Sequence, residues 1–194
     1  MTNFIQKFFD ERAAKWDEGE TCSLEKKRAL LSKIGIKPGD KVIDIACGTG
    51  VISGILHEMT GEKVFAVDLS DKMIEVAKEK YKDNDGISFR QCDFVKDKIE
   101  GKYDYAVIYN AYPHFLDVES LSNKLYDVLK ENGKFAIVHS MSRKELDSHH
   151  SGDASCISRS LRPAKEEAEY FSERFWTEIA EESDSHYLLV FRKK

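Results

Sequence analysis

The fold is decided by one stretch, Val42-Ile43-Asp44-Ile45-Ala46-Cys47-Gly48-Thr49-Gly50, which runs directly into an expected helix at residues 51–59. Its apolar first half predicts a buried strand, and its small residues predict a tight turn. A strand that turns through small residues into a helix lets the backbone approach a ligand closely, with the N–H groups of the helix N-terminus directed at it. The stretch therefore predicts a binding loop of the kind that holds nucleotides.

Further apolar stretches rich in Val, Ile, Phe and Tyr follow this one and alternate with helical patterns. The alternation predicts β-α units and a parallel sheet. Each stretch is a near-continuous apolar run, which is typical of strands buried on both faces. The last two stretches alternate in polarity and predict an antiparallel hairpin. The expected strands are residues 41–46, 63–67, 87–92, 103–109, 134–139, 174–180 and 186–192.

Apolar residues at helical spacing predict the helices between these strands. Ser70 and Asp117 stand where they can cap two of them, and Asn132-Gly133 predicts the stop of the second. A polar stretch rich in Ser and His, residues 141–162, lacks periodicity and is expected to form a lid-like loop. The expected helices are residues 3–17, 23–34, 51–59, 71–81, 117–131 and 164–172.

The composition is that of one folded domain. The 194 residues fit the roughly 100–200 residues of a typical domain, and 41% of them are apolar. A net charge of −5, with neither sign gathered into a block, argues against nucleic acid as a partner. No apolar run approaches the ~18 residues that cross a bilayer and no signal core is visible, so a cytoplasmic protein is expected. The four cysteines lack a C-x-x-C spacing and are expected to be reduced thiols, namely Cys22, Cys47, Cys92 and Cys156.

Asp68 adds a second feature to the binding loop. It lies eighteen residues after Gly50, at the end of the second expected strand, where an acid accepts hydrogen bonds from ribose hydroxyls. Two ligand classes use such an arrangement, dinucleotides and S-adenosylmethionine. The dinucleotide pattern G-x-G-x-x-G is incomplete, because Ser53 stands in place of its third glycine. Asp44 favours S-adenosylmethionine, since a carboxylate suits its ammonium group better than a pyrophosphate.

These residues resemble the class I S-adenosylmethionine-dependent methyltransferases. The stretch from Asp44 to Gly50 is similar to their motif I, with Ala46 in place of its first glycine, and Asp68 is similar to their ribose-binding acid. The resemblance implies an α/β, Rossmann-like sheet of seven strands in the order 3-2-1-4-5-7-6, with strand 7 antiparallel and helices on both faces. It implies S-adenosylmethionine as the cofactor and S-adenosylhomocysteine as the product. The residues expected to bind the cofactor are Trp16, Asp44, Ala46, Cys47, Gly48, Gly50, Asp68, Leu69, Met73, Cys92, Asp93, Phe94 and Asn110.

Residues 8–17 resemble the Phe-Asp-x-x-Ala-x-x-Trp-Asp opening of small-molecule methyltransferases, in which this segment covers the cofactor. The resemblance implies that residues 1–35 cover the site and that Trp16 or Arg12 contacts cofactor or substrate. The apolar positions by themselves also fit an amphipathic stripe packed on the sheet. Both interpretations stay open.

The candidates for substrate chemistry follow the fourth and fifth expected strands, at the edge where a doubly wound sheet opens its crevice. Tyr112, His114 and His139 are the predicted catalytic residues. A histidine takes up a proton near neutral pH, which suits a general base. His149 and His150 are expected to join them from the loop. The alternative is a set of polar pocket or surface residues, and no His or Cys spacing favours a metal site.

The sequence thus predicts one enzymatic domain, residues 1–194, that transfers a methyl group from S-adenosylmethionine to a small-molecule acceptor. It is expected to act as a monomer or homodimer, without nucleic-acid or membrane partners. Two alternatives stay open. One is a binding module that senses S-adenosylmethionine or S-adenosylhomocysteine without transfer, and the other is a protein or RNA methyltransferase.

Overall fold

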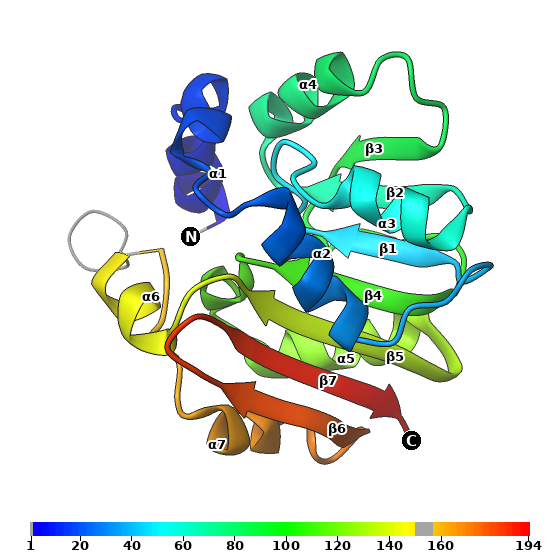
Figure 1. Ribbon diagram of the computed structural model, residues 1–194, viewed down its shortest axis with the longest axis vertical. Helices are drawn as coiled ribbons and strands as arrows, with labels where there is room; N and C mark the ends of the chain where they lie inside the picture. Colours follow the sequence, from blue (N-terminus) through cyan, green and yellow to red (C-terminus); the bar gives the residue numbers. More distant parts are fainter. Residues whose placement is uncertain (1, 150–156) are drawn as a thin grey trace.

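A computed structural model describes residues 2–149 and 157–194 of the chain. Within these residues one seven-stranded sheet runs in the order β3-β2-β1-β4-β5-β7-β6 (Figure 1). β1 pairs in parallel with β2 and β4, whereas β7 is antiparallel to β5 and β6. The predicted strand order is confirmed. The strands are β1 Val42–Ile45, β2 Val64–Asp68, β3 Ile87–Gln91, β4 Tyr103–Tyr109, β5 Leu129–His139, β6 Phe175–Glu182 and β7 Tyr187–Lys193.

Helices cover both faces of the sheet, with α2 and α3 in front of it and α5 behind it in Figure 1. Every residue of β1 is buried, as expected for a central strand with helices on both sides. No helix in the described ranges has the length and apolar character needed to cross a bilayer. The α-helices are α1 Thr2–Asp10, α2 Leu24–Lys33, α3 Ser53–Thr60, α4 Asp71–Lys80, α5 Val118–Val128, α6 Arg143–His149 and α7 Ala164–Ala168. The 3-10 helices are η1 Ala13–Gly19, η2 Tyr112–His114 and η4 Glu169–Phe171.

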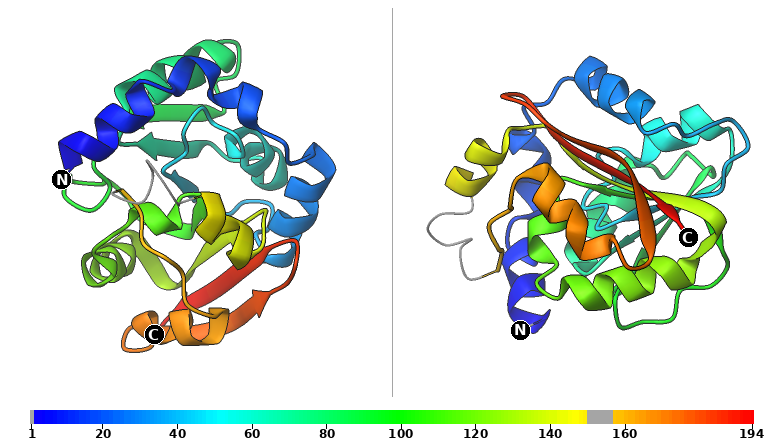
Figure 2. Two further views of the ribbon diagram at one scale, coloured as in Figure 1. Left: turned by 90° about the vertical axis from the view of Figure 1, so that its left-hand side faces the viewer. Right: turned by 90° about the horizontal axis from the view of Figure 1, so that it is seen from below.

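The first expected helix, residues 3–17, is broken in two. α1 ends at Asp10 and η1 begins at Ala13. Arg12 lies at the break, where its guanidinium donates to the carbonyl of Phe8 at 2.9 Å and stacks 3.6 Å from the centroid of the Phe8 ring. The change of direction lets the chain after Arg12 follow the carboxyl edge of the sheet instead of continuing past it (Figure 2, left).

The expected helix over residues 117–131 is too long by three residues. α5 ends at Val128, and Leu129 already pairs with Tyr103 as the start of β5. Asn132 does take the predicted left-handed conformation, with φ 59°. It lies in an irregular part of β5, because the register passes from Tyr103 opposite Leu129 to Tyr105 opposite Lys134. Asn132 therefore shapes a bulge in a strand, not the end of a helix.

The expected lid, residues 141–162, is helical in its first part. Ser142 and Glu145 form a reciprocal capping box, in which the Ser142 N–H donates to the Glu145 carboxylate at 2.8 Å and the Glu145 N–H donates to the Ser142 hydroxyl at 3.2 Å. α6 follows this cap, and its Leu146 is buried in the core. The prediction of a loop is wrong for residues 143–149, while residues 150–156 fall outside the described ranges.

Candidate functional site

The turn after β1 has an unusual backbone. Ala46, Gly48 and Gly50 all have positive φ angles, of 55°, 54° and 77°. Glycine adopts this region without cost, whereas an L side chain does so with strain, so Ala46 stands where a glycine would fit better. A Cβ on Gly50 would lie 2.8 Å from a ring atom of Tyr81, whose hydroxyl donates to the Gly50 carbonyl at 2.9 Å. The close approach of Tyr81 thus requires a glycine at position 50.

A cavity of about 1020 Å³ opens beside this turn, at the carboxyl ends of β1, β2 and β4. Figure 2 (left) looks onto this edge, where α1 and α6 both lie. Gly50 does not line the cavity, so its predicted direct contact with the cofactor is wrong: Tyr81 packs against it instead. The other residues predicted to bind the cofactor all line it, namely Trp16, Asp44, Ala46, Cys47, Gly48, Asp68, Leu69, Met73, Cys92, Asp93, Phe94 and Asn110.

Asp44 presents a buried carboxylate to the cavity. Only 1% of its surface is exposed, and its Oδ2 accepts a hydrogen bond from the Ser53 hydroxyl at 2.6 Å. Its Oδ1 is also buried and accepts no hydrogen bond from any described residue. Burial raises the pKa of Asp44 to about 7. A buried carboxylate oxygen without a donor, beside a cavity, is suited to a cationic donor from a ligand.

Asp68 ties the end of β2 to the glycine turn. Its Oδ2 accepts from the Gly48 N–H and its Oδ1 from the Ser70 N–H, both at 2.8 Å. Burial raises the pKa of Asp68 to about 6, although these two hydrogen bonds act in the opposite direction. Each carboxylate oxygen has a second lone pair, so Asp68 can still accept hydrogen bonds from hydroxyl groups in the cavity.

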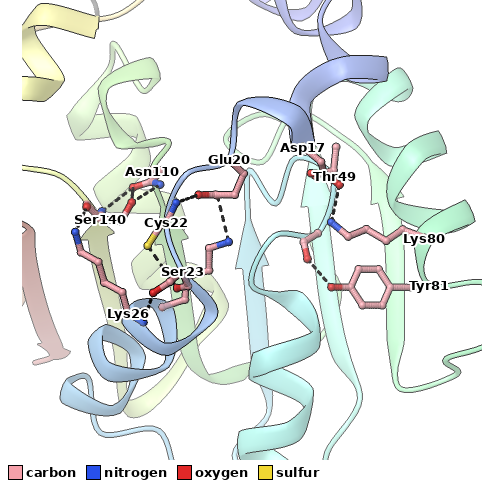
Figure 3. A network of polar contacts seen from close by, with 12 residues as sticks. Asp17, Glu20, Cys22, Ser23, Lys26, Thr49, Lys80, Tyr81, Asn110 and Ser140 are labelled. Carbon is pink, nitrogen blue, oxygen red and sulfur yellow. Dashed lines mark hydrogen bonds and ion pairs between the residues drawn. The ribbon is translucent and has the colours of Figure 1, made fainter.

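The N-terminal segment is fastened over this turn by side-chain hydrogen bonds (Figure 3). Asp17 accepts from the Thr49 hydroxyl at 2.5 Å and from the Lys80 ammonium at 2.8 Å. Further back, Asp10 accepts from the Ser70 hydroxyl at 2.5 Å. These contacts place Trp16 and its neighbours in the wall of the cavity.

The same segment continues to the ends of β4 and β5 (Figure 3). Glu20 accepts from the Cys22 N–H at 2.7 Å, and the Lys26 ammonium donates to the Ser140 carbonyl at 2.8 Å. Ser140 is held in turn by Asn110, whose Oδ1 accepts from the Ser140 N–H at 2.9 Å and whose Nδ2 donates to the Ser140 hydroxyl at 3.0 Å. Glu20 and Ser140 line the cavity and were missed by the sequence reasoning. The position of Ser140, directly after the fifth expected strand, was the signal available for it.

His114 is the one predicted catalytic residue that lines the cavity. Its ring packs edge to face on Phe9, with the centroids 5.0 Å apart, and Phe9 packs in the same way on Trp16 at 5.5 Å. The His114 Nδ1 lies 3.1 Å from the carbonyl oxygen of Ile157. Because a carbonyl only accepts hydrogen bonds, this contact assigns the proton to Nδ1.

Tyr112 and His139 do not line the cavity, and their predicted roles as catalytic residues are corrected here. Tyr112 is fully buried, and its hydroxyl donates to the carboxylate of Glu167 at 2.7 Å while the Arg159 guanidinium lies 4.6 Å from its ring centroid. Burial raises the pKa of the Tyr112 hydroxyl far above its usual value. His139 is fully buried as well, with its ring 6.1 Å from that of Tyr187. Both side chains belong to the protein core.

No cluster of metal-ligating side chains occurs in residues 2–149 and 157–194. Cys47 and Cys92 are free and buried, and burial together with the nearby Asp44 raises the pKa of the Cys47 thiol well above its usual range. A thiol held in its neutral form is a poor nucleophile. His149 is the last residue of α6, whereas His150 and Cys156 lie outside the described residues.

The profile of a family described as "Methyltransferase domain" matches residues 36–187, which is most of the chain. The chain belongs to this methyltransferase family. The predicted class I S-adenosylmethionine-dependent methyltransferase fold is confirmed by the strand order and by this family match, and S-adenosylmethionine stays the predicted cofactor. The residues in the cavity fit this cofactor, because the unsatisfied oxygen of Asp44 suits an ammonium group and the left-handed turn keeps the backbone at Gly48 open.

Curated relatives match part of this chain. The chain is 34% identical over 112 residues to a sterol 24-C-methyltransferase of Saccharomyces cerevisiae, covering 56% of the chain and 29% of that protein. It is 33% identical over 79 residues to a ribosomal protein L11 methyltransferase of Thermotoga neapolitana, covering 40% of the chain and 30% of that protein. The matched regions thus span about a third of the length of these relatives.

A solved structure extends the likeness to the whole fold. The crystal structure of an S-adenosylmethionine-dependent methyltransferase from Aquifex aeolicus superposes with a TM-score of 0.78, at 18% sequence identity. The superposition covers 95% of this chain and 98% of that one. At this identity the likeness shows the fold alone.

Proposed function

We propose that this methyltransferase domain transfers the methyl group of S-adenosylmethionine to a small-molecule acceptor. The observation that carries the proposal is the size and enclosure of the cavity. Pockets for single drug-sized ligands span roughly 300–1000 Å³, and the cavity of about 1020 Å³ therefore has room for a small acceptor beside the cofactor. Its walls come from the sheet edge on one side and from the N-terminal segment, including Phe9 and Trp16, on the other.

The proposed cofactor contacts follow from the donors and acceptors on the cavity wall. Asp44 Oδ1 is assigned to the ammonium group, and the carboxylate of Asp68 to the ribose hydroxyls. Asp93 and Phe94 are assigned to the adenine, since both line the cavity beyond the end of β3. Trp16 covers the part of the cavity assigned to the cofactor, and its Nε1 lies 3.8 Å from the position that a Cβ on Gly48 would take.

The cofactor supplies a methyl group that is already activated by the positive sulfur. The work of the protein is to orient the acceptor in line with that methyl group and to exclude water from the site. In the transfer the bond from the acceptor to carbon forms while the bond from carbon to sulfur breaks, and its electron pair stays on sulfur. We assign to His114, which lines the cavity with its Nδ1–H against the Ile157 carbonyl, the uptake of a proton from an acceptor that arrives protonated.

Two alternative functions are distinguished from this one by the labelling experiment below. The named activity of the ribosomal protein L11 methyltransferase makes a protein acceptor the second candidate. A sensor of the cofactor without transfer is the third. The cavity favours the small molecule because the N-terminal segment, fastened through Asp17 and Asp10, narrows the approach to the methyl group.

The acceptor class is tested by following the label from methyl-labelled S-adenosylmethionine. The purified protein is incubated separately with the small-molecule, protein and RNA fractions of a cell extract. Label transferred only into the small-molecule fraction is the expected result. Label in the protein or RNA fraction would contradict the proposal, and binding of cofactor without transfer to any fraction would favour the sensor.

A further inference from the structure

We propose that the acceptor has an apolar body, which one wall of the cavity is built to hold. This inference rests on the proposed function and names the chemistry of its acceptor. The wall in question, the apolar wall, consists of Ile5, Phe9, Phe115, Leu116, Met141 and Leu146.

Four segments bring the apolar wall together, and one of them supplies Met141, just after the end of β5. Ile5 and Phe9 are four residues apart on α1 and share one face of that helix. Phe115 and Leu116 directly follow η2, and Leu146 comes from α6. Phe115 and Met141 pack against the same core cluster that contains Leu146. The ring of Phe9 packs on the ring of His114, with the two centroids 5.0 Å apart. Phe9 thus brings the wall into contact with the residue assigned to accept the proton.

Part of this wall is exposed where the cavity meets solvent. Leu116 is 37% exposed, although it lines the cavity, and Ile5 and Phe115 are only half-buried. Phe4, next to Ile5 on α1, is 55% exposed. A group of large apolar side chains at the mouth of a pocket is unfavourable in water and marks a surface that a ligand covers. An acceptor whose apolar part reaches the mouth would cover Leu116.

Three charged side chains near the wall in sequence are already engaged. Arg12 donates to the Phe8 carbonyl and stacks on the Phe8 ring. Asp117 caps α5 through the N–H and the hydroxyl of Ser120, at 3.0 and 2.6 Å. The Glu11 carboxylate lies 3.9 Å from the ammonium group of Lys7. The wall thus offers an acceptor apolar contact area, and His114, Asn110 and Ser140 are polar side chains in the lining of the same cavity.

The proposal predicts how affinity depends on chain length. Each methylene of a ligand that enters an apolar wall strengthens binding about three- to fourfold, until the space is filled. The test uses the full chain saturated with S-adenosylhomocysteine and the neutral fluorescent probe N-phenyl-1-naphthylamine. Straight-chain alkanols from butanol to decanol then displace the probe. The expected result is a displacement constant that falls about three- to fourfold per methylene over the first members of the series.

A pair of variants ties the result to the apolar wall. Leu116→Asp is expected to weaken displacement by octanol at least tenfold while the affinity for S-adenosylhomocysteine stays unchanged. Trp176→Asp is the matched control, because Trp176 is also a large exposed side chain, 54% exposed, but lies on β6 and does not line the cavity. Leu116→Ala, which adds no charge, is expected to give a smaller loss in the same direction.

Equal displacement constants for all alkanols would overturn the proposal, and so would a failure of the fluorescent probe to bind. Equal displacement constants in the variants at positions 116 and 176 would overturn it as well. Binding of S-adenosylhomocysteine is titrated first in its own experiment. Its absence would contradict the proposed function, whereas the alkanol series on the same protein would still report on the wall. The two failures are therefore distinguishable.

Discussion

Ser53 donates a hydrogen bond to one oxygen of Asp44 at 2.6 Å, and the other oxygen of that buried carboxylate receives none from any described residue. Ser53 is the first residue of α3, which follows the glycine turn directly. The turn and the start of the helix therefore fix the orientation of the carboxylate before any ligand binds. A preoriented acceptor loses less entropy when it meets a cationic group.

We predict that binding through Asp44 weakens as the pH falls. Burial raises the pKa of Asp44 to about 7, and an ammonium group binds the ionised form. The affinity for S-adenosylhomocysteine should fall about tenfold per pH unit below that pKa. Calorimetry from about pH 8 to about pH 6 measures it. Asp44→Asn should bind more weakly with a flatter profile, and an equally steep profile in this variant would refute the assignment.

The same pKa shift should affect stability with the opposite sign. The pKa of Asp44 in the folded, cofactor-free protein lies above its ordinary value of 3.8. The contribution to stability is therefore fully present below about pH 4 and is lost as the pH rises to about 7. The melting temperature of the cofactor-free wild type, measured relative to that of Asp44→Asn, should therefore fall over this range. The same pH dependence in both proteins would argue against the raised pKa.

Ala46→Gly should stabilise the protein. Ala46 has a φ of 55°, a region that costs an L residue roughly 1–2 kcal/mol, while glycine loses about 0.5–1 kcal/mol of that gain through the entropy of the unfolded chain. The expected net gain is up to about 1.5 kcal/mol in the free energy of unfolding, measured with denaturant. Gly48→Ala is the control in the reverse direction and should destabilise, since its φ is 54°. Equal stability of all three proteins would contradict this explanation.

Tyr112→Phe should reduce stability without affecting the site. The hydroxyl of Tyr112 donates to Glu167, which is fully buried and also accepts from Arg159 at 2.5 Å and from the Arg162 N–H at 3.0 Å. Removing one donor to a buried carboxylate should cost about 1–3 kcal/mol of the free energy of unfolding. The affinity for S-adenosylhomocysteine should be unchanged. Tyr170→Phe is the control, because Tyr170 is 49% exposed, and it should cost nothing measurable. A large loss of transfer activity in stable Tyr112→Phe protein would restore the catalytic role.

Asp17→Ala should speed the release of the cofactor. Asp17 fastens η1 to Thr49 of the glycine turn and to Lys80 of α4. Loss of charge-assisted hydrogen bonds of this kind costs about 1.5–3 kcal/mol when they are buried, and this side chain is partly exposed, so we expect a three- to thirtyfold faster release. Stopped-flow fluorescence of Trp16, which lines the cavity, follows the release. Glu18→Ala, on the same segment, should leave the rate unchanged.

The strand order and many of the residues that line the cavity could be predicted from the sequence because their signals are local. The apolar runs, the turn from Asp44 to Gly50 and the acid at position 68 are each contained in a few consecutive residues. Long-range partners explain what was missed. Tyr112 follows a strand as a pocket residue would, but the carboxylate that holds it, Glu167, is 55 positions away. Gly50 matched the binding motif, yet the ring of Tyr81 occupies the space beside it.

The helix at the start of the expected lid was missed for a different reason, because its signal is local. Its signal was present in the sequence, because Ser142 and Glu145 have the spacing of a capping box. The polar composition of the whole stretch concealed that signal. The bulge in β5 could not be foreseen in the same way, since Asn132-Gly133 predicts a left-handed residue but not whether a helix or a strand precedes it.

The most direct test of the account is a calorimetric titration of S-adenosylmethionine into the wild-type protein and into Asp68→Asn. The account predicts one site per chain, and a tenfold to hundredfold weaker affinity in the variant, because a charge-assisted hydrogen bond worth about 1.5–3 kcal/mol is lost. Asp83→Asn, at an exposed position, is the control and should bind as the wild type does. If the wild type and Asp68→Asn bind S-adenosylmethionine with equal affinity, the assigned site is contradicted.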